Sequence, residues 1–237
     1  MEVMLDQHIM INEKILKKMV SSAKIKKDDT VLEIGAGTGN LTKELVKTKG
    51  KIIAVEISKK FEKDLKNIKA EIVFGNILKM IDKIRFDKVI SNLPYSICEA
   101  LIQKLIFCDF KLAVLTVPRS FAYRLLGKSR LGLLAQEFFD AEILFEVEKN
   151  AFRPEPKTNS VVILLKKRKR KSLFSRVVLQ QKMKVKNAVM RCLFEEKKMT
   201  KNQARKHLKT LKLNNKLLEK RVKDTDLEDF KTLKKTL

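Results

Sequence analysis

The chain has 237 residues, 44% of them hydrophobic, which is enough for one catalytic domain and a small second domain around a buried core. No stretch is apolar enough to cross a bilayer and no signal-peptide pattern is found, so a cytoplasmic protein is expected. Three cysteines and two histidines show no metal-ligand spacing, which argues against a zinc site. The net charge of +25 exceeds what a small acidic metabolite needs and favours a polyphosphate partner.

The positive charge is unevenly distributed. Residues 1–165 contain 28 Lys/Arg and 21 Asp/Glu, whereas residues 166–237 contain 25 and 7. Lysine enrichment caused by genome composition or habitat would spread evenly, so this asymmetry predicts nucleic-acid binding by the tail. The candidate RNA-binding residues form one run: Lys166, Lys167, Arg168, Lys169, Arg170 and Lys171.

Short apolar runs alternate with amphipathic helical patterns along the first half of the chain. The expected strands are Val31–Ile34, Ile52–Val55, Glu71–Phe74, Lys88–Ser91 and Leu112–Val117. The helical patterns between them are Leu41–Lys47, Phe61–Asn67 and Cys98–Phe107. This alternation predicts βαβ units and a parallel, Rossmann-like α/β sheet.

Two further apolar runs, Glu142–Val147 and Ser160–Leu165, follow each other without a strong helix between them. They predict an antiparallel hairpin at one sheet edge, with residues 150–159 at its tip. The basic run gives the best boundary, so residues 1–168 are expected to form the catalytic domain and residues 169–237 a small basic helical domain that binds RNA. Helices are predicted there at Val177–Phe194, Lys201–Leu211 and Asn215–Lys223.

A glycine-rich turn follows the first expected strand, in the run LEIGAGTGN at residues 32–40. Gly35, Gly37 and Gly39 allow positive φ angles and close approach of a ligand to the backbone. The turn alone also fits dinucleotide enzymes. Glu33 at the strand end would repel a pyrophosphate, however, and suits an ammonium or a sulfonium. The turn therefore predicts a nucleoside cofactor with a positively charged group.

Polar residues also end the next two expected strands. Glu56 lies 17 residues beyond Gly39, near the spacing at which an acid binds ribose hydroxyls, although an ordinary solvated Glu is the simpler alternative. Asn76 follows the run IVFG, where its amide can contact an adenine edge or serve only as a turn residue.

The run VISNLPYSI, residues 89–97, ends an apolar strand in Asn92-Leu93-Pro94-Tyr95. The Asn92 side-chain oxygen and the Pro94 carbonyl are two acceptors that can hold both hydrogens of an exocyclic amine, while the Tyr95 ring stacks on its base. This geometry localises the nitrogen lone pair, so no general base is required before attack. For Tyr95 the alternative is core packing. The tetrapeptide predicts methyl transfer to the amino group of an extruded nucleobase.

These motifs together resemble the small-subunit ribosomal RNA adenine N6-dimethyltransferases, which use S-adenosylmethionine. The resemblance begins at LDQHIM, residues 5–10, and includes the glycine turn, the Asn92 tetrapeptide and FRPEPK, residues 152–157. It implies an S-adenosylmethionine-dependent methyltransferase sheet with a small C-terminal helical domain. It also implies dimethylation of two adjacent adenines near the 3′ end of small-subunit ribosomal RNA during ribosome biogenesis. A monomer without a bound metal is expected.

The resemblance assigns roles to the matching residues. The implied cofactor-binding residues are Gln7, His8, Met10, Glu33, Gly35, Gly37, Gly39, Glu56, Asn76 and Asn92. The implied residues at the target base are Asn92, Pro94 and Tyr95, with Phe152 closing the opposite face of the base.

The chain departs from the family pattern in places. Asn76 stands where the family usually has Asp, and the loss of charge should weaken cofactor binding modestly. Pro118 and Ser120 stand where Gln and Glu are usual. Two alternatives therefore stay open: a large-subunit RNA methyltransferase of the macrolide-resistance type, and a noncatalytic RNA-binding assembly factor with the same fold.

Overall fold

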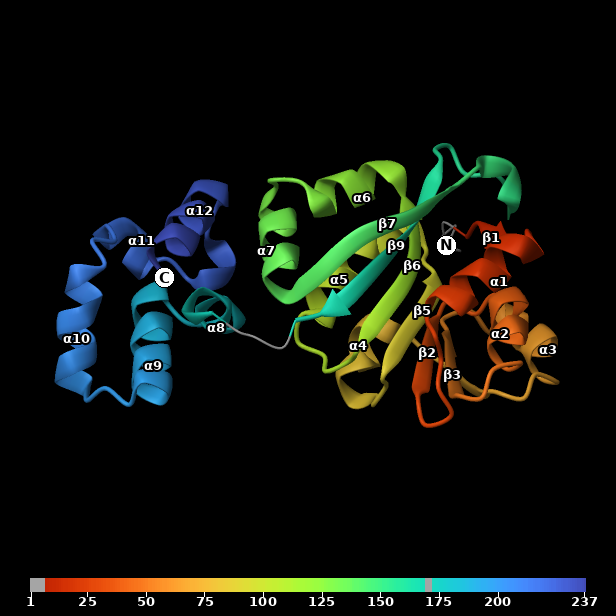
Figure 1. Ribbon diagram of the computed structural model, residues 1–237, viewed down its shortest axis with the longest axis horizontal. Helices are drawn as coiled ribbons and strands as arrows, with labels where there is room; N and C mark the ends of the chain where they lie inside the picture. Colours follow the sequence, from red (N-terminus) through yellow and green to blue (C-terminus); the bar gives the residue numbers. More distant parts are fainter. Residues whose placement is uncertain (1–6, 169–171) are drawn as a thin grey trace. The chain divides into compact units, whose positions relative to one another are not determined.

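The computed structural model describes residues 7–168 and 172–237 (Figure 1). Backbone contacts divide the chain into two compact units, the first containing residues up to 127 and 139–167, the second residues 128–138 and 168–237. The expected boundary near residue 168 coincides with the start of the second segment of the second unit. Residues 128–138 belong to that unit as well, which was not expected. Within the described residues, none of the helices is long and apolar enough to span a membrane.

The first unit is built around a seven-stranded sheet of order β4-β3-β2-β5-β6-β9-β7. Five of its strands are parallel: β2 (Thr30–Ile34), β3 (Lys51–Glu56), β4 (Glu71–Phe74), β5 (Lys88–Asn92) and β6 (Leu112–Pro118). Their nearly continuous apolar runs are buried along the inner strands, as expected for a parallel sheet covered on both faces. The parallel α/β sheet predicted from the sequence is confirmed.

Two antiparallel strands complete the sheet at one edge. They are β7 (Phe139–Val147) and β9 (Ser160–Lys167), and β9 inserts between β6 and β7. The predicted edge hairpin is therefore confirmed. The loop at its tip contains the 3-10 turn η4 (Lys149–Ala151) and the short strand β8 (Phe152–Arg153). Strand β8 pairs with β1 (Ile9–Met10), which ties the N-terminal segment to this loop.

Helices flank the sheet (Figure 1). Helix α1 (Glu13–Ser22) begins at Asn12, whose side-chain oxygen accepts hydrogen bonds from two backbone N–H groups of the first turn. Leu16 and Met19 of α1 pack with Leu41 and Leu45 of α2 in one hydrophobic core on the sheet. The remaining helices and 3-10 turns of this unit are α2 (Asn40–Leu45), η1 (Lys59–Phe61), α3 (Glu62–Leu65), α4 (Ile77–Met80), η2 (Ile81–Lys83), η3 (Tyr95–Ile97), α5 (Cys98–Leu105) and α6 (Arg119–Leu126).

The strand order reverses between β2 and β5, the switch point at which parallel α/β sheets bind ligands. Strands β2 and β3 share five paired positions, whereas β2 and β5 share only two, Val31 with Lys88 and Leu32 with Val89. Both pairs lie toward the amino ends of the strands. The carboxyl ends of β2 and β5 therefore diverge, and a ligand site can form between them.

The second unit is helical. Its elements are α7 (Arg130–Phe138), α8 (Leu173–Leu179), α9 (Val185–Lys197), α10 (Lys201–Thr210), α11 (Asn215–Glu219), η5 (Val222–Asp224) and α12 (Leu227–Thr236). Phe174 and Phe230 meet edge to face at 4.8 Å between ring centroids in its core. Capping boxes at Thr200 and Asp226 begin α10 and α12.

The prediction of one helix over Val177–Phe194 is wrong, because the chain leaves the helix after Leu179 and starts a new one at Val185. Residues 181–185 instead pair with residues 220–223. The N–H groups of Val222 and Lys223 donate to carbonyls of this segment at 2.9 and 3.1 Å. These nonlocal hydrogen bonds satisfy backbone groups that a continuous helix would have used itself.

Candidate functional site

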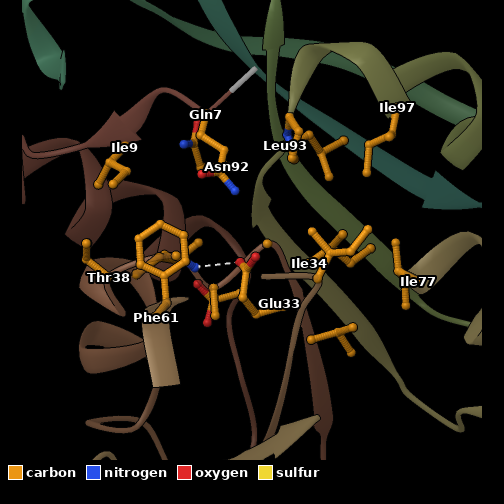
Figure 2. A pocket seen from close by; sticks show the side chains of 18 of the residues that line it. Gln7, Ile9, Glu33, Ile34, Thr38, Phe61, Ile77, Asn92, Leu93 and Ile97 are labelled. Carbon is orange, nitrogen blue, oxygen red and sulfur yellow. Dashed lines mark hydrogen bonds between the residues drawn. The ribbon is translucent and has the colours of Figure 1, made fainter. Parts of the chain in front are cut away.

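A cavity opens where β2, β3, β4 and β5 end, at the switch point of the sheet (Figure 2). The structure brings ten of the predicted site residues together around it: Gln7, His8, Met10, Glu33, Gly35, Gly37, Glu56, Asn76, Asn92 and Pro94. Gly39, Tyr95 and Phe152 do not line the cavity. The elements that supply the lining are far apart in the sequence, so the parallel topology itself assembles the site.

The glycine turn forms one wall of the cavity. Gly35, Gly37 and Gly39 all have positive φ angles, of 75°, 52° and 78°. A Cβ on Gly37 would meet nothing closer than the Ile9 side chain at 4.0 Å, so this backbone is open to a ligand. A Cβ on Gly39 would lie 2.4 Å from the Ile68 side chain. The positive φ and this close approach both favour glycine at position 39, and its contact with the cofactor stays a prediction.

Glu56 fixes the shape of the turn. Its side chain is buried, and its two oxygens accept hydrogen bonds from the N–H groups of Gly37 and Ser58 at 2.9 and 2.8 Å. Each carboxylate oxygen can accept a second hydrogen bond, so Glu56 keeps acceptor capacity for a hydroxyl donor. The carboxylate thus both stiffens the turn and faces the cavity.

Glu33 has the most strongly shifted pKa among the residues of the site. Its side chain is 1% exposed, and its Oε2 atom has no hydrogen-bond partner. Burial, reinforced by the nearby Glu56 carboxylate, raises the pKa of Glu33 to about 8. A buried carboxyl group with a free acceptor atom on a cavity wall is suited to a cationic ligand group, which would stabilise its charged form.

Part of the cavity lining is apolar. Ile57, Phe61, Ile77 and Leu78 line it, and Ile57 is 51% exposed although it is a large hydrophobic residue. Asn76 also lines this part, and its side-chain oxygen caps α4 by accepting from the Leu78 N–H at 2.9 Å. Apolar side chains beside one amide suit a flat heterocycle with a polar edge.

Asn92 projects into the cavity from the end of β5, near Gln7 in the view of Figure 2. Its Nδ2 atom donates to the His8 carbonyl at 2.7 Å, while its buried Oδ1 atom has no partner. The strap formed by residues 7–12 holds that carbonyl in place. Two hydrogen bonds with outside residues fix the strap. The Asn40 side chain donates to the Met10 carbonyl at 2.9 Å, and the Ile11 N–H donates to the Ala151 carbonyl at 2.8 Å. The amide therefore presents an unused acceptor to a ligand.

Pro94 and Tyr95 complete the corner that follows β5. The Pro94 carbonyl accepts from the Ile97 N–H at 3.2 Å and from the Cys98 thiol at 3.6 Å, so an incoming donor has to replace the weak thiol contact. The half-buried Tyr95 ring lies 5.3 Å from the His8 ring, and its hydroxyl forms a hydrogen bond with the buried Ser160 side chain. A serine on the edge hairpin thus holds the phenol of this corner in position.

Phe152 does not face the site. Its side chain is 0% exposed and packs in the core that also contains Met10, to which it is paired through β1 and β8. The expectation that Phe152 closes the far side of a target base therefore needs correction for this conformation. Phe152 instead anchors the strap of residues 7–12.

The basic run is only partly described, since Lys169, Arg170 and Lys171 lie outside the described residues. Lys166 pairs with Glu142 at 3.4 Å on the surface. The Lys167 ammonium donates to the carbonyls of Leu105 and Ile106 at 2.9 and 2.7 Å. Lys167 is therefore a structural residue of the first unit. The Arg168 N–H donates to the Phe138 carbonyl in the second unit.

Sequence reasoning missed several lining residues. The apolar floor residues Ile57 and Phe61 carry no motif, although an isoleucine directly after a strand-ending glutamate was an available signal. Thr38 lies inside the glycine turn and has a buried hydroxyl without a partner. Ser160 was expected only as a strand residue, because nothing in the sequence links it to Tyr95.

The sequence matches the family described as ribosomal RNA adenine dimethylase over residues 2–235. It is 41% identical over 174 residues to the probable ribosomal RNA small subunit methyltransferase A of Methanosarcina acetivorans, an alignment that covers 68% of this chain and 63% of that protein. A protein of the same name from Pyrococcus furiosus is 37% identical over 169 residues, covering 67% and 62%. The chain thus spans less than two thirds of the length of these curated relatives.

Solved structures show the same fold. A dimethyladenosine transferase from Plasmodium falciparum superposes with a TM-score of 0.68 at 29% identity, covering 95% of this chain and 96% of that one. The 23S rRNA methyltransferase ErmE superposes with a TM-score of 0.64 at 19% identity, covering 97% and 99%, a likeness that concerns the fold alone. The expected Rossmann-like methyltransferase fold is confirmed. Because the family match extends over nearly every residue, the chain belongs to the ribosomal RNA adenine dimethylase family.

Proposed function

We propose that this protein transfers methyl groups from S-adenosylmethionine to the N6 atoms of adenines near the 3′ end of small-subunit ribosomal RNA. The single observation that carries the proposal is the buried, unpartnered Oδ1 atom of Asn92, a residue that lines the cavity together with Pro94. Two acceptors at one corner match the two hydrogens of an exocyclic amine. The names of the archaeal relatives support the small subunit as the source of the RNA.

The residues of the cavity fit S-adenosylmethionine. Glu33 offers an orphaned acceptor to a cationic group, Glu56 retains capacity for ribose hydroxyls, and the apolar floor around Ile57 suits an adenine ring. The open backbone at Gly37 leaves room for the ligand to lie against the turn. When bound, this cofactor supplies the electrophilic methyl group.

The protein residues then have to orient the target nitrogen. Asn92 Oδ1 accepts one N6 hydrogen and the Pro94 carbonyl accepts the other, which directs the nitrogen lone pair into the cavity. The hydrogen bond from Asn92 Nδ2 to the His8 carbonyl prevents the amide from turning its donor group toward the amine. Tyr95 stacks on the extruded base, which offsets an unstacking cost of a few kcal/mol. The product nitrogen retains one hydrogen after the first transfer, so a second transfer can follow.

The RNA contact of the second unit centres on α10. Residues 198–218 contain seven Lys/Arg and no acidic residue. All seven cations are exposed, and none forms an ion pair within the described part of the chain: Lys198, Lys201, Arg205, Lys206, Lys209, Lys212 and Lys216. Lys184 and Lys186, by contrast, both pair with Glu219. Unpaired cations along α10 and at the neighbouring ends of α9 and α11 favour binding to RNA phosphates.

We further propose that residues 1–168 carry catalysis and residues 169–237 RNA binding, in a cytoplasmic monomer. The three cysteines are all free, which fits a reducing compartment. Light scattering of the purified protein tests the monomer, because a dimer would double the mass.

Methyl transfer is tested separately on small and on large ribosomal subunits from cells that lack the dimethyl marks, with labelled S-adenosylmethionine and mapping of the modified nucleotides. Asn92→Ala should abolish transfer while leaving cofactor affinity within a few-fold of wild type, because the orienting acceptor is lost. Full activity of this variant contradicts the mechanism. Label found only in large-subunit RNA supports the macrolide-resistance type of enzyme instead, and cofactor binding without transfer to any RNA supports an assembly factor.

The α10 contact is tested by salt dependence. Replacing Arg205, Lys206 and Lys209 with Gln should weaken RNA binding and lower the slope of log affinity against log salt by about 3. The matched control replaces Lys231, Lys234 and Lys235 of α12 with Gln, which removes equal charge from a helix that also carries acidic residues. Equal slopes for both triple variants would mean that α10 contributes only general positive charge and makes no specific phosphate contacts.

A further inference from the structure

Helix α6 presents an outward face of unusual composition. Arg119, Tyr123 and Arg124 are exposed on it, while Phe121 and Leu125 pack inward. Tyr123 is 53% exposed although it is one of only two tyrosines in the chain. An aromatic ring left in solvent between two arginines is available to stack on a ligand.

This face starts beside the Tyr95 corner. Pro118, the last residue of β6, pairs with Ser160, and the side chain of Ser160 binds the Tyr95 hydroxyl. Directly after it, the Arg119 N–H donates to the Asn159 carbonyl at 3.0 Å. The amino end of α6 is therefore next to the residue that holds the target-stacking ring.

The far end of α6 is tied to the same corner. Arg124 pairs at 2.6 Å with Glu99, which lies in the first turn of α5, four residues after Tyr95. Both ends of α6 are thus linked to the segment that contains Tyr95. Tyr123 is exposed between Arg119 and Arg124, one helical turn after Arg119.

The side chains of this face suit a nucleotide. The Arg119 guanidinium lies 5.6 Å from the centre of the Tyr123 ring, a cation–π contact that supports the ring in place. Arg119 and Arg124 pair with Glu146 and Glu99, but all four side chains are about half exposed, so these ion pairs contribute little and can exchange for phosphate. An exposed aromatic ring between arginines is the arrangement by which single-stranded nucleic acids are held.

We propose that α6 is a platform for the nucleotide next to the extruded adenine, with Tyr123 stacking on its base and Arg119 and Arg124 contacting the flanking phosphates. The proposal rests on the proposed function, since extrusion of one base leaves its neighbour without a stacking partner. Tyr123 supplies that partner on the protein surface. It is a positioning residue for the substrate strand and touches neither the methyl group nor the target nitrogen.

The experiment uses a short RNA stem-loop with the target adenines and 2-aminopurine at the neighbouring nucleotide, whose fluorescence falls on stacking. The wild type should quench the probe, Tyr123→Phe should quench it equally, and Tyr123→Ala should not. In methyl transfer to the same RNA, Tyr123→Ala should lower kcat/KM by about 5- to 150-fold, the loss of one stacked base. Cofactor affinity should stay unchanged. Phe107→Ala is the matched control, because Phe107 is 56% exposed and follows α5 at the opposite end of the sheet.

Three results would overturn the proposal: quenching that survives in Tyr123→Ala, a kcat/KM equal to wild type, or the same loss in Phe107→Ala. A defect of Tyr123→Ala on intact subunits with normal quenching of the stem-loop would assign the surface to a protein partner instead. If the wild type quenches the probe through Tyr123 but methylates no RNA, the proposed function fails and the platform stands.

Discussion

Glu33 allows a quantitative prediction, because its cost to the folded protein depends on pH. Burial raises the pKa of this carboxyl group from 4.5 to about 8. The folded protein therefore retains a proton that the unfolded chain releases as the pH rises from 4.5 to 8. The contribution of this group to the free energy of unfolding is greatest below pH 4.5. Between pH 4.5 and pH 8 it falls by about 1.4 kcal/mol per pH unit. Above pH 8 the loss levels off.

Replacing Glu33 with Gln removes this titration and keeps the shape of the side chain. All other ionisable groups are common to the two proteins, so their contributions cancel in the difference. The free energy of unfolding of Glu33→Gln minus that of the wild type should rise by about 2.5 kcal/mol between pH 5 and pH 7. Urea titrations at pH 5, 6 and 7, without cofactor, measure this difference directly.

Glu56→Gln is the matched control in the same cavity wall. Its carboxylate oxygens accept hydrogen bonds from the N–H groups of Gly37 and Ser58, so an amide donor there should destabilise the protein at every pH tested. Only for Glu33→Gln should the free energy of unfolding, relative to that of the wild type, increase as the pH rises. A difference that stays flat from pH 5 to pH 7 would mean that Glu33 is ionised in the folded protein, and the argument for its orphaned, neutral state would fail.

The same proton provides a test of cofactor binding. At pH 7 a group with a pKa of about 8 is roughly nine-tenths protonated, so a cationic ligand that binds its charged form must release nearly one proton. Calorimetry of S-adenosylmethionine binding in two buffers of different ionisation enthalpy should detect this proton in the wild type and none in Glu33→Gln. Affinity of the wild type should also rise toward pH 8. Equal proton release in both proteins would assign the titration to another group.

Three other outcomes follow from the contacts. Tyr95→Phe and Ser160→Ala should each lower kcat/KM for RNA, and the double variant should be no worse than either one, because all three lose the same hydrogen bond; additive losses would refute the link. Gly39→Ala should lower the unfolding midpoint in urea through its positive φ and its clash with a neighbouring side chain, whereas unchanged stability would refute that assignment. Lys88→Met should cost about 1–3 kcal/mol of unfolding free energy, because the buried Asp29 carboxylate loses this partner but keeps Lys111 and the Lys26 N–H; unchanged stability would contradict it.

The sheet and the cavity wall were predictable because their signals are local. Apolar runs of four to seven residues and the glycine turn after Glu33 are visible in any short window of the sequence. The parallel topology then brings the ends of β2, β3, β4 and β5 to one edge without further information. The position of Asn92 and Glu56 at a common cavity follows from that topology alone.

The parts that could not be predicted depend on contacts between distant segments. The pairing of β1 with β8 joins residues 9–10 to residues 152–153, and Phe152 packs in a core built from several distant segments. A phenylalanine after a strand fits a stacking role and a core role equally well in the sequence. The break between α8 and α9 is also nonlocal, because the segment 181–185 is held by residues 220–223.

The orientation of the Asn92 amide depends on both kinds of information. The sequence places an amide at the end of a strand, and an amide can offer a ligand either a donor or an acceptor. The His8 carbonyl removes that ambiguity by taking the Nδ2 hydrogen, which leaves Oδ1 for the ligand. The orientation of the Asn92 amide therefore depends on the N-terminal strap. Because the burial of Phe152 and Met10 helps to fix the strap, a core residue outside the cavity lining influences which polar atom Asn92 offers to a ligand.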